Sequence, residues 1–371
     1  MIGMNGTGKT TILKALAVAT RGLGPGTSTF SFLNGLNLAQ CIVGLNDDGT
    51  SVYHGLTVGN PIWNSVLAVY CPSEGDGSFN PTSIDPGRIT LDRALTSLGA
   101  EVYKHVVSNL TAGKFWERIV AHIKRRESEY FQFQRLPECR DLTISEIDEI
   151  FDRSHPKVLE QLANIWNGIL HLAYLEFDWE SASIPIQLKD TFKAYIRTRN
   201  KAGSQTLKYA ELSTGIRHYL FRLGHIWSLY FDRPQSESVV FVDEPEGSLY
   251  PDFLYDIVST YQTIAPGAQI FMATHSPIVA AQFKPEERFI LSFDDNGKLL
   301  LRRGTSPEGD DPNDLLVQDF GVSSLMTEAG EEAWRRFLEL RRKIPLASAD
   351  EREGLVEEYS RLGTEYHFPQ P

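Results

Sequence analysis

The chain has little of what marks a disulfide-bonded or membrane-spanning protein. Its 371 residues include three cysteines, Cys41, Cys71 and Cys139, which lie far apart and form no C-x-x-C pair. This spacing favours neither a disulfide framework nor a cysteine-bound zinc ion. The longest apolar runs, such as residues 65–71, fall far short of the roughly 20 residues that span a bilayer. The start of the chain is glycine-rich and polar, unlike a signal peptide, so we expect a cytoplasmic protein without a membrane span.

Basic residues are also outnumbered, because 36 Lys and Arg stand against 48 Asp and Glu, which gives a formal charge of −12. That balance excludes a surface covered with phosphate-binding side chains, but it allows a local basic patch. Residues 189–208 contain six basic residues and one acidic residue, and residues 124–126 are basic among the aromatic side chains of residues 114–140. This mixture is typical either of a nucleic-acid surface or of a solvated helix face with its aromatics in the core, and we favour the second interpretation.

The first ten residues, MIGMNGTGKT, contain a phosphate-binding loop of the form G-x-x-x-x-G-K-[ST]. Glycines allow backbone N–H groups to surround phosphate oxygens, and the helix that follows points its positive end at them. We expect Lys9 to reach the β- and γ-phosphates and the Thr10 hydroxyl to hold Mg²⁺. The predicted nucleotide-binding residues of this loop are Gly3, Asn5, Gly6, Gly8, Lys9, Thr10 and Thr11.

A P-loop ordinarily follows a buried strand, yet only Met1 and Ile2 precede Gly3. We therefore expect a chain that is truncated or whose start was assigned too late, and a stop codon directly upstream would contradict this. Without that strand, nucleotide binding by the chain as given stays an open question.

Two later apolar runs end in polar side chains. Residues 239–242 are followed by Asp243 and Glu244, and residues 270–273 are followed by Thr274 and His275. Parallel strands deliver such residues to the carboxyl edge of a sheet, where α/β proteins bind ligands. We expect Asp243 to support Mg²⁺, Glu244 to deprotonate the attacking water, and His275 to hydrogen-bond the γ-phosphate. The simpler alternatives are a solvated acidic turn and a structural histidine.

Ser213 and Gly215 open a predicted helix over residues 213–230. A hydroxyl and a glycine at a helix N-terminus can form an anion site. The simpler interpretation is that Ser213 is an N-cap.

The order of these motifs resembles that of the ATP-binding-cassette (ABC) class of P-loop ATPase heads. The chain contains, in this order, a P-loop, a long insertion, an L-S-x-G signature, a D-E-P-E run and a T-H-S run. DEPEGSLYP from Asp243 and ATHSPIV from Ala273 are similar to the soluble SMC/RecF/OLD-like group of AAA family ATPases rather than to transporters. GDDPNDLL at residues 309–316 is similar to a segment of OLD-like and Septu-type (PtuA-like) antiphage defence ATPases.

The resemblance implies that two heads hold ATP between them, with Ser213 and Gly215 of one copy facing the γ-phosphate bound by Lys9 of the other. It implies ATP and Mg²⁺ as cofactors, hydrolysis to ADP and phosphate, and a homodimer or higher homo-oligomer. The signature departs from L-S-G-G-Q, and Gln40 is a weak candidate for the glutamine loop. No Toprim or HNH nuclease pattern follows His275, so the implied partner is a separate nuclease of HNH type.

The expected fold is an α/β P-loop ATPase head of the ABC type, with an inserted helical subdomain and a C-terminal helical hairpin. The predicted parts are the N-terminal part of the head (1–90), the helical insertion (91–206), the C-terminal part of the head (207–305) and the C-terminal helical region (306–371). Gly363 should end the last helix. Apolar residues of the closing helices should pack against the head rather than a partner; they are Trp334, Phe337, Leu338, Leu355, Tyr359 and Leu362.

Three functions remain open at this stage. The first is an ATPase whose ATP-dependent dimer regulates a partner nuclease in antiphage defence, with nucleic acid reached through the basic insertion. The second is a RecF- or SMC-like DNA repair or maintenance ATPase, although the prolines of the insertion and its lack of heptads exclude a long coiled coil. The third is a nucleotide-gated scaffold with negligible hydrolysis.

Overall fold

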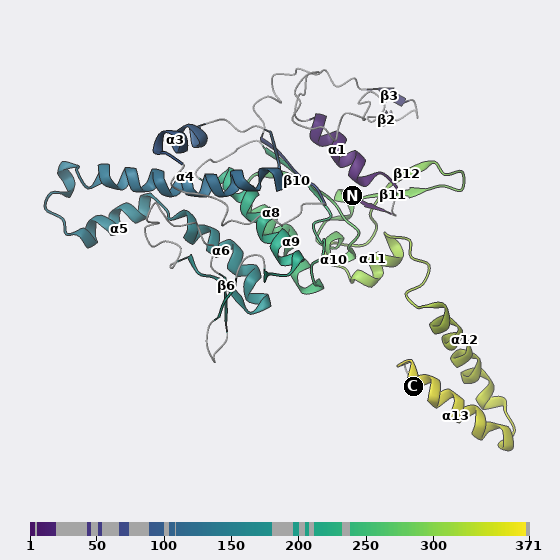
Figure 1. The fold of residues 1–371 in the computed structure, drawn as a ribbon. Coiled ribbons are helices and arrows are strands. Elements are labelled where there is room, and N and C mark those ends of the chain that lie inside the picture. Colours follow the sequence, from purple (N-terminus) through teal and green to yellow (C-terminus); the bar gives the residue numbers. More distant parts are fainter. Residues whose placement is uncertain are drawn as a thin grey trace.

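Four short apolar segments form a parallel sheet at the centre of the computed structural model (Figure 1). They lie in the order β10-β9-β4-β5, and every neighbouring pair is parallel. β4 and β9 are buried along their whole length, as expected of strands covered on both faces, and this explains their unbroken apolar runs. The strands are β4 (Leu67–Cys71), β5 (Lys104–Val106), β9 (Ser238–Asp243) and β10 (Ala268–Ala273).

The structure describes residues 1–3, 6–19, 43–45, 51–53, 67–73, 89–99, 104–107, 109–179, 196–199, 205–207, 211–231 and 238–368. Within these ranges the strands predicted at 65–71, 239–242 and 270–273 are confirmed, each within two residues of its expected start. Within the N-terminal part of the head, β2 (Val43–Leu45) and β3 (Ser51–Tyr53) pair antiparallel.

A strand does precede the P-loop. β1 (Ile2–Gly3) pairs in parallel with β11 (Phe289–Phe293), which pairs antiparallel with β12 (Leu299–Arg303). On the other side of β1, the Met1 carbonyl accepts a hydrogen bond of 3.0 Å from the amide of Thr274, just past β10. β1 therefore lies between β10 and β11, and the β11–β12 hairpin confirms the turn predicted around residues 294–297.

Helices cover both faces of the sheet, and the pleat of β9 divides the core between them. Val239 and Phe241 pack with α1 (Lys9–Ala19) in one cluster. Val240 and Val242 point the other way, into the larger cluster that contains α4, α6, α8 and α9. These helices span α4 (Asn109–Phe133), α6 (Val158–Leu170), α8 (Thr214–Tyr230) and α9 (Ile257–Ile264). None of the described helices combines the length and apolarity that crossing a membrane requires.

The stretch between residues 91 and 206 is only partly helical. α3 (Leu91–Gly99) packs on α4, and α5 (Ile144–Ser154) opens with the predicted capping box of Thr143 and Glu146. Three short strands interrupt these helices, so the expectation of an all-helical stretch was wrong there. One is β5 of the central sheet, and the others, β6 (Leu175–Phe177) and β7 (Ile196–Thr198), form a small antiparallel sheet with β8 (Thr206–Leu207).

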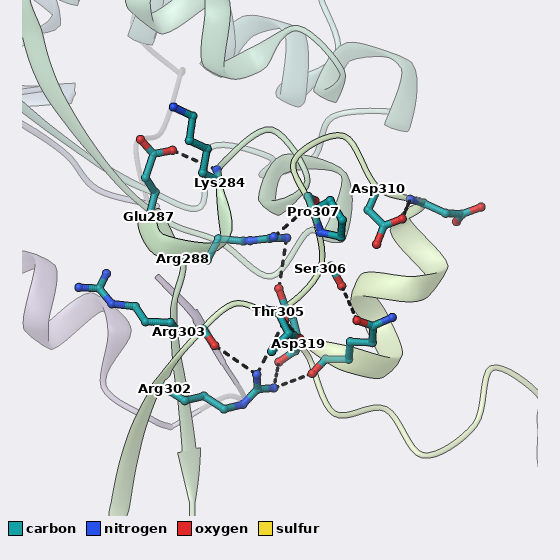
Figure 2. A network of polar contacts seen from close by, with 12 residues as sticks. Lys284, Glu287, Arg288, Arg302, Arg303, Thr305, Ser306, Pro307, Asp310 and Asp319 are labelled. Atoms are coloured by element: carbon teal, nitrogen blue, oxygen red, sulfur yellow. Dashed lines mark hydrogen bonds and ion pairs between the residues drawn. The ribbon is translucent and has the colours of Figure 1, made fainter.

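A buried ion pair joins the β11–β12 hairpin to α11 (Pro312–Gln318), the helix after α10 (Pro277–Ala280) (Figure 2). Nη1 of Arg288 lies 3.2 Å from Oδ2 of Asp319, and both side chains are at most 1% exposed. The amide of Thr305 donates to Oδ1 of Asp319 over 2.9 Å, and Arg302 donates to the Asp319 carbonyl over 2.8 Å. Oδ1 of the carboxylate thus accepts hydrogen bonds from Thr305, whereas Oδ2 meets Arg288 as an ion pair without a hydrogen bond.

The last two helices form an arm that extends away from the head (Figure 1). α12 (Glu328–Lys343) and α13 (Ala349–Glu365) share a core of their own, which includes Phe337, Leu340 and Leu362. Five of the six predicted apolar residues thus line the closing helix pair, as the sequence indicated, but they pack on one another and not on the head as expected. Gly363 lies inside α13 rather than at its end.

Candidate active site

The start of α1 and the end of β9 meet at the carboxyl edge of the sheet. The Thr10 hydroxyl donates to Oδ1 of Asp243 over 3.1 Å, although 233 positions separate the two residues. Asp243 is 1% exposed, and its Oδ2 accepts no hydrogen bond from any described residue. Burial raises the pKa of Asp243, and the hydrogen bond from Thr10 opposes this while the charge of Glu244 adds to it. The charges of Lys14 and Arg222 oppose the rise in pKa as well, but no described residue donates a hydrogen bond to Oδ2.

These residues fit a magnesium ion. A hydroxyl and a carboxylate oxygen are ligands of the kind that Mg²⁺ prefers, and the ion commonly takes one or two protein ligands with the rest from phosphates and water. The unsatisfied Oδ2 of Asp243 supplies the specific observation, because a buried carboxylate oxygen without a donor is costly. Thr10 and Asp243 would hold the ion, which when bound would neutralise charge on phosphate oxygens.

The P-loop has the backbone that the glycine pattern predicts. Gly6 and Gly8 have φ values of +82° and +81°, in the left-handed region that favours glycine. Nζ of Lys9 donates to the Gly3 carbonyl over 2.8 Å. Burial lowers the pKa of this lysine, while the carboxylates of the site raise it. Thr11 follows with an exposed side chain, and the predicted site residue Asn5 lies outside the described residues.

The loops after β9 and β10 are tied together at the same edge. The Glu244 amide donates to the Ala273 carbonyl over 2.8 Å, and the His275 amide donates to Oε1 of Glu246 over 2.6 Å. Glu244 and His275 thus belong to neighbouring loops, with the His275 side chain exposed. The sequence placed Glu246 within the D-E-P-E run, but it gave no sign that this carboxylate binds the next loop.

Arg222 is a second residue that the sequence did not single out. It lies in α8, is 7% exposed, and donates to the carbonyls of Pro72 over 3.0 Å and of Glu244 over 3.3 Å. A single arginine in an apolar helix carries no local signal of such distant partners.

The start of α8 contacts the loop after β9. Ser213 is the N-cap, and its Oγ accepts from the Ile216 amide over 3.4 Å, so the simpler interpretation of Ser213 is confirmed. Its side chain is also exposed and can meet a further ligand. A Cβ on Gly215 would lie 1.9 Å from the Ser248 carbonyl oxygen, so this close approach requires glycine.

Comparison with known proteins finds a family match for part of the chain. Residues 110–281 match the family described as "AAA domain, putative AbiEii toxin, Type IV TA system". This segment is therefore similar to AAA-type ATPase domains. The match takes in Ser213, Asp243, Glu244 and His275 and spans somewhat less than half of the chain.

Two solved structures are similar to the chain as well. One is a crystal structure of the SmcHead bound to the C-winged helix domain of ScpA, with a TM-score of 0.37. The other is the Smc head domain with an extended coiled coil bound to the C-terminal domain of ScpA, derived from Pyrococcus furiosus, with a TM-score of 0.38. In each case the identity is 12%, and the likeness covers 81% of this chain and 89% of the other. TM-scores of this size do not establish a shared fold, and no curated protein matches the chain.

Lys124 and Arg126, two basic residues of α4, make contacts within the fold. Phe115 and Trp116 are buried in the core. Lys124 donates to the Ile89 carbonyl, and Arg126 pairs with Asp152. This favours the solvated helix face with core aromatics over a nucleic-acid surface at these residues. Most of the second basic stretch, 189–208, lies outside the described residues.

Proposed function

We propose that the chain hydrolyses ATP to ADP and phosphate as an ABC-type head. The observation that carries this is the hydrogen bond between Thr10 and Asp243, which joins the P-loop to the end of β9 and leaves one buried carboxylate oxygen free for a cation. Lys9 would bind the β- and γ-phosphates. Glu244 would take the proton of the attacking water, and His275 would hydrogen-bond the γ-phosphate.

The same proposal makes the active unit a dimer. Ser213 is exposed at the N-terminus of α8, where the helix dipole favours an anion. We propose that Ser213 and Gly215 complete the nucleotide site of a second copy, whose own P-loop holds the phosphates. The two sites would then form together when ATP binds.

Glu244→Gln tests the proposed base. We expect turnover to fall by about 10²- to 10⁴-fold, with ATP binding retained, because the substitution leaves Lys9 and Thr10 unchanged. ATP-bound dimers should accumulate, which light scattering would detect. Glu286→Gln, on the surface after α10, is the matched control and should hydrolyse ATP like the wild type. Unchanged turnover in Glu244→Gln would rule out the assigned base, and no hydrolysis by the wild type would favour the scaffold.

We further propose that the ATP-dependent dimer regulates a separate nuclease, of HNH type, in antiphage defence. The family description names a putative AbiEii toxin of a type IV TA system, and the proposal extends this wording to a role in defence. The projecting arm of α12 and α13 offers a surface for a partner. The test is DNA cleavage by an HNH nuclease encoded beside this chain, with ATP, without it, and with Glu244→Gln. DNA cleavage at the same rate with and without ATP would contradict this role. ATP-stimulated DNA binding without a nuclease would favour a RecF- or SMC-like role.

A further inference from the structure

The Arg222 side chain links three parts of the site that are far apart in the sequence. Its Nη2 donates to the carbonyl of Pro72, directly after β4, and its Nη1 donates to the carbonyl of Glu244, directly after β9. The arginine itself belongs to α8, the helix that starts beside Ser213. One buried cation thus joins that helix to the residue proposed as the base.

The two carbonyl hydrogen bonds alone do not account for an arginine at this position. Both carbonyl oxygens are neutral, whereas Arg288, another buried arginine, faces the carboxylate of Asp319. Burying a cation costs free energy, and an apolar side chain of similar volume often serves a core as well or better. The presence of an arginine is therefore explained by the backbone groups that its side chain holds in place.

The carbonyl that Arg222 holds belongs to a strained residue. Glu244 has a φ of +46°, in the left-handed region, which costs a residue other than glycine about 1–3 kcal/mol and persists only where neighbouring contacts fix it. Its amide donates to the Ala273 carbonyl over 2.8 Å, and its carbonyl also accepts from the Gly247 amide over 3.1 Å. The direction of the Glu244 side chain depends on these contacts.

The start of α8 also contacts the loop that carries Glu244. Gly215 packs against the carbonyl of Ser248 so closely that no side chain would fit. Arg222 follows Ser213 on the same helix at a distance of roughly 13 Å along its axis. Because a helix moves as a rigid rod over this length, a displacement of Ser213 also displaces Arg222 and the contacts that it makes.

We propose that Arg222 is a positioning residue that couples the start of α8 to the backbone of Glu244. When Ser213 engages the nucleotide of a second copy, α8 shifts, Arg222 moves the Glu244 carbonyl, and the carboxylate takes its place beside the attacking water. The inference rests on the proposed ATPase function and adds a route by which dimer formation controls hydrolysis.

Steady-state kinetics of Arg222→Met and Arg222→Lys provide the first test. We expect kcat of Arg222→Met to fall by about 10- to 100-fold, the size of effect that a misplaced catalytic group produces. KM for ATP should stay unchanged, because Lys9 and Thr10 are untouched, and lysine should restore part of the loss. The matched control is Arg288→Met, an equally buried arginine, which should lower stability but not kcat per folded molecule. A wild-type kcat in Arg222→Met would overturn the inference.

Hydrogen exchange gives a second readout that needs no hydrolysis. The Glu244 and Gly247 amides should exchange faster in Arg222→Gln than in the wild type or in Arg288→Met, because the carbonyl between them loses its cationic donor. Unchanged protection of both amides would overturn the inference even if Arg222→Met does not fold. If the wild type hydrolyses no ATP, the proposed function fails, whereas the exchange data still decide whether Arg222 fixes the Glu244 backbone.

Discussion

Two aspartates of this protein are buried to the same degree, but their surroundings differ. Asp319 is 0% exposed and Asp243 is 1% exposed. Asp319 lies against the guanidinium groups of Arg288 and Arg302 and accepts from Thr305 (Figure 2). Asp243 accepts from the Thr10 hydroxyl, and its second oxygen meets no described donor. Asp319 is thus engaged by two guanidinium groups within the fold, whereas Oδ2 of Asp243, which lies beside the P-loop at the edge of the sheet, is placed to meet a further cation.

Among these predictions, Asp319→Ala should cause the largest loss in the free energy of unfolding. It leaves Arg288 buried without its counter-charge, and breaking a buried ion pair in this way costs about 3–5 kcal/mol. The measurement is urea unfolding at neutral pH, with ATP hydrolysis recorded per folded molecule. Glu308→Ala, an exposed acidic residue on the same side of the hairpin, is the control. A loss of turnover in the folded fraction would mean that the two aspartates are not functionally separate.

Asp243→Asn should lower magnesium-dependent ATP hydrolysis by about 100-fold, because an amide cannot offer the charge that the ion requires. Calorimetric titration of Mg²⁺ with ATP would show the same loss in affinity. Asp319→Asn serves as the matched substitution and should leave metal affinity unchanged. Full activity in Asp243→Asn would remove Asp243 from the metal site.

The two Asp→Asn substitutions should also change stability in opposite directions. Burial raises the pKa of Asp243 above its ordinary value of 3.8, so the unfolded chain loses this proton at a lower pH than the folded one. Stability of the metal-free protein therefore falls as pH rises from about 3.8 to the raised pKa. Asp243→Asn removes that loss and should unfold at a higher temperature than the wild type at neutral pH, whereas Asp319→Asn should unfold at a lower one. Melting temperatures measured between pH 3.5 and pH 8 test both the expected increase for Asp243→Asn and the expected decrease for Asp319→Asn.

Replacing both Arg288 and Asp319 should change the free energy of unfolding least. In Arg288→Met combined with Asp319→Leu, no uncompensated charge remains, and such exchanges are often neutral or stabilising. We expect a free energy of unfolding within about 1 kcal/mol of the wild type, far from the result for Asp319→Ala. A double variant as unstable as Asp319→Ala would show that the hydrogen bonds to Thr305, not the matched charges, hold α11 in place.

The parts of the site that follow short motifs could be predicted from the sequence. Thr10 and Asp243 come together as expected, because a P-loop and a strand ending in acidic residues each carry their geometry locally. Arg222 could not be predicted, because its partner Pro72 lies 150 positions away and nothing in the helix indicates it. Strands of two or three residues such as β8 are too short to display a period. Gly363 was mistaken for a helix end because packing within the arm outweighs its low helix propensity.

The separate core of the arm has a mechanical consequence. Because α12 and α13 pack mainly on each other, turning them about the connecting residues 320–327 requires no rearrangement of the sheet or its helices. α12 alone is about 24 Å long, so a turn of about 10° at its base carries the far end through about 4 Å. At that far end lies Leu346, which is 87% exposed. A small rotation at residues 320–327 would therefore displace this apolar tip further than the base of the arm.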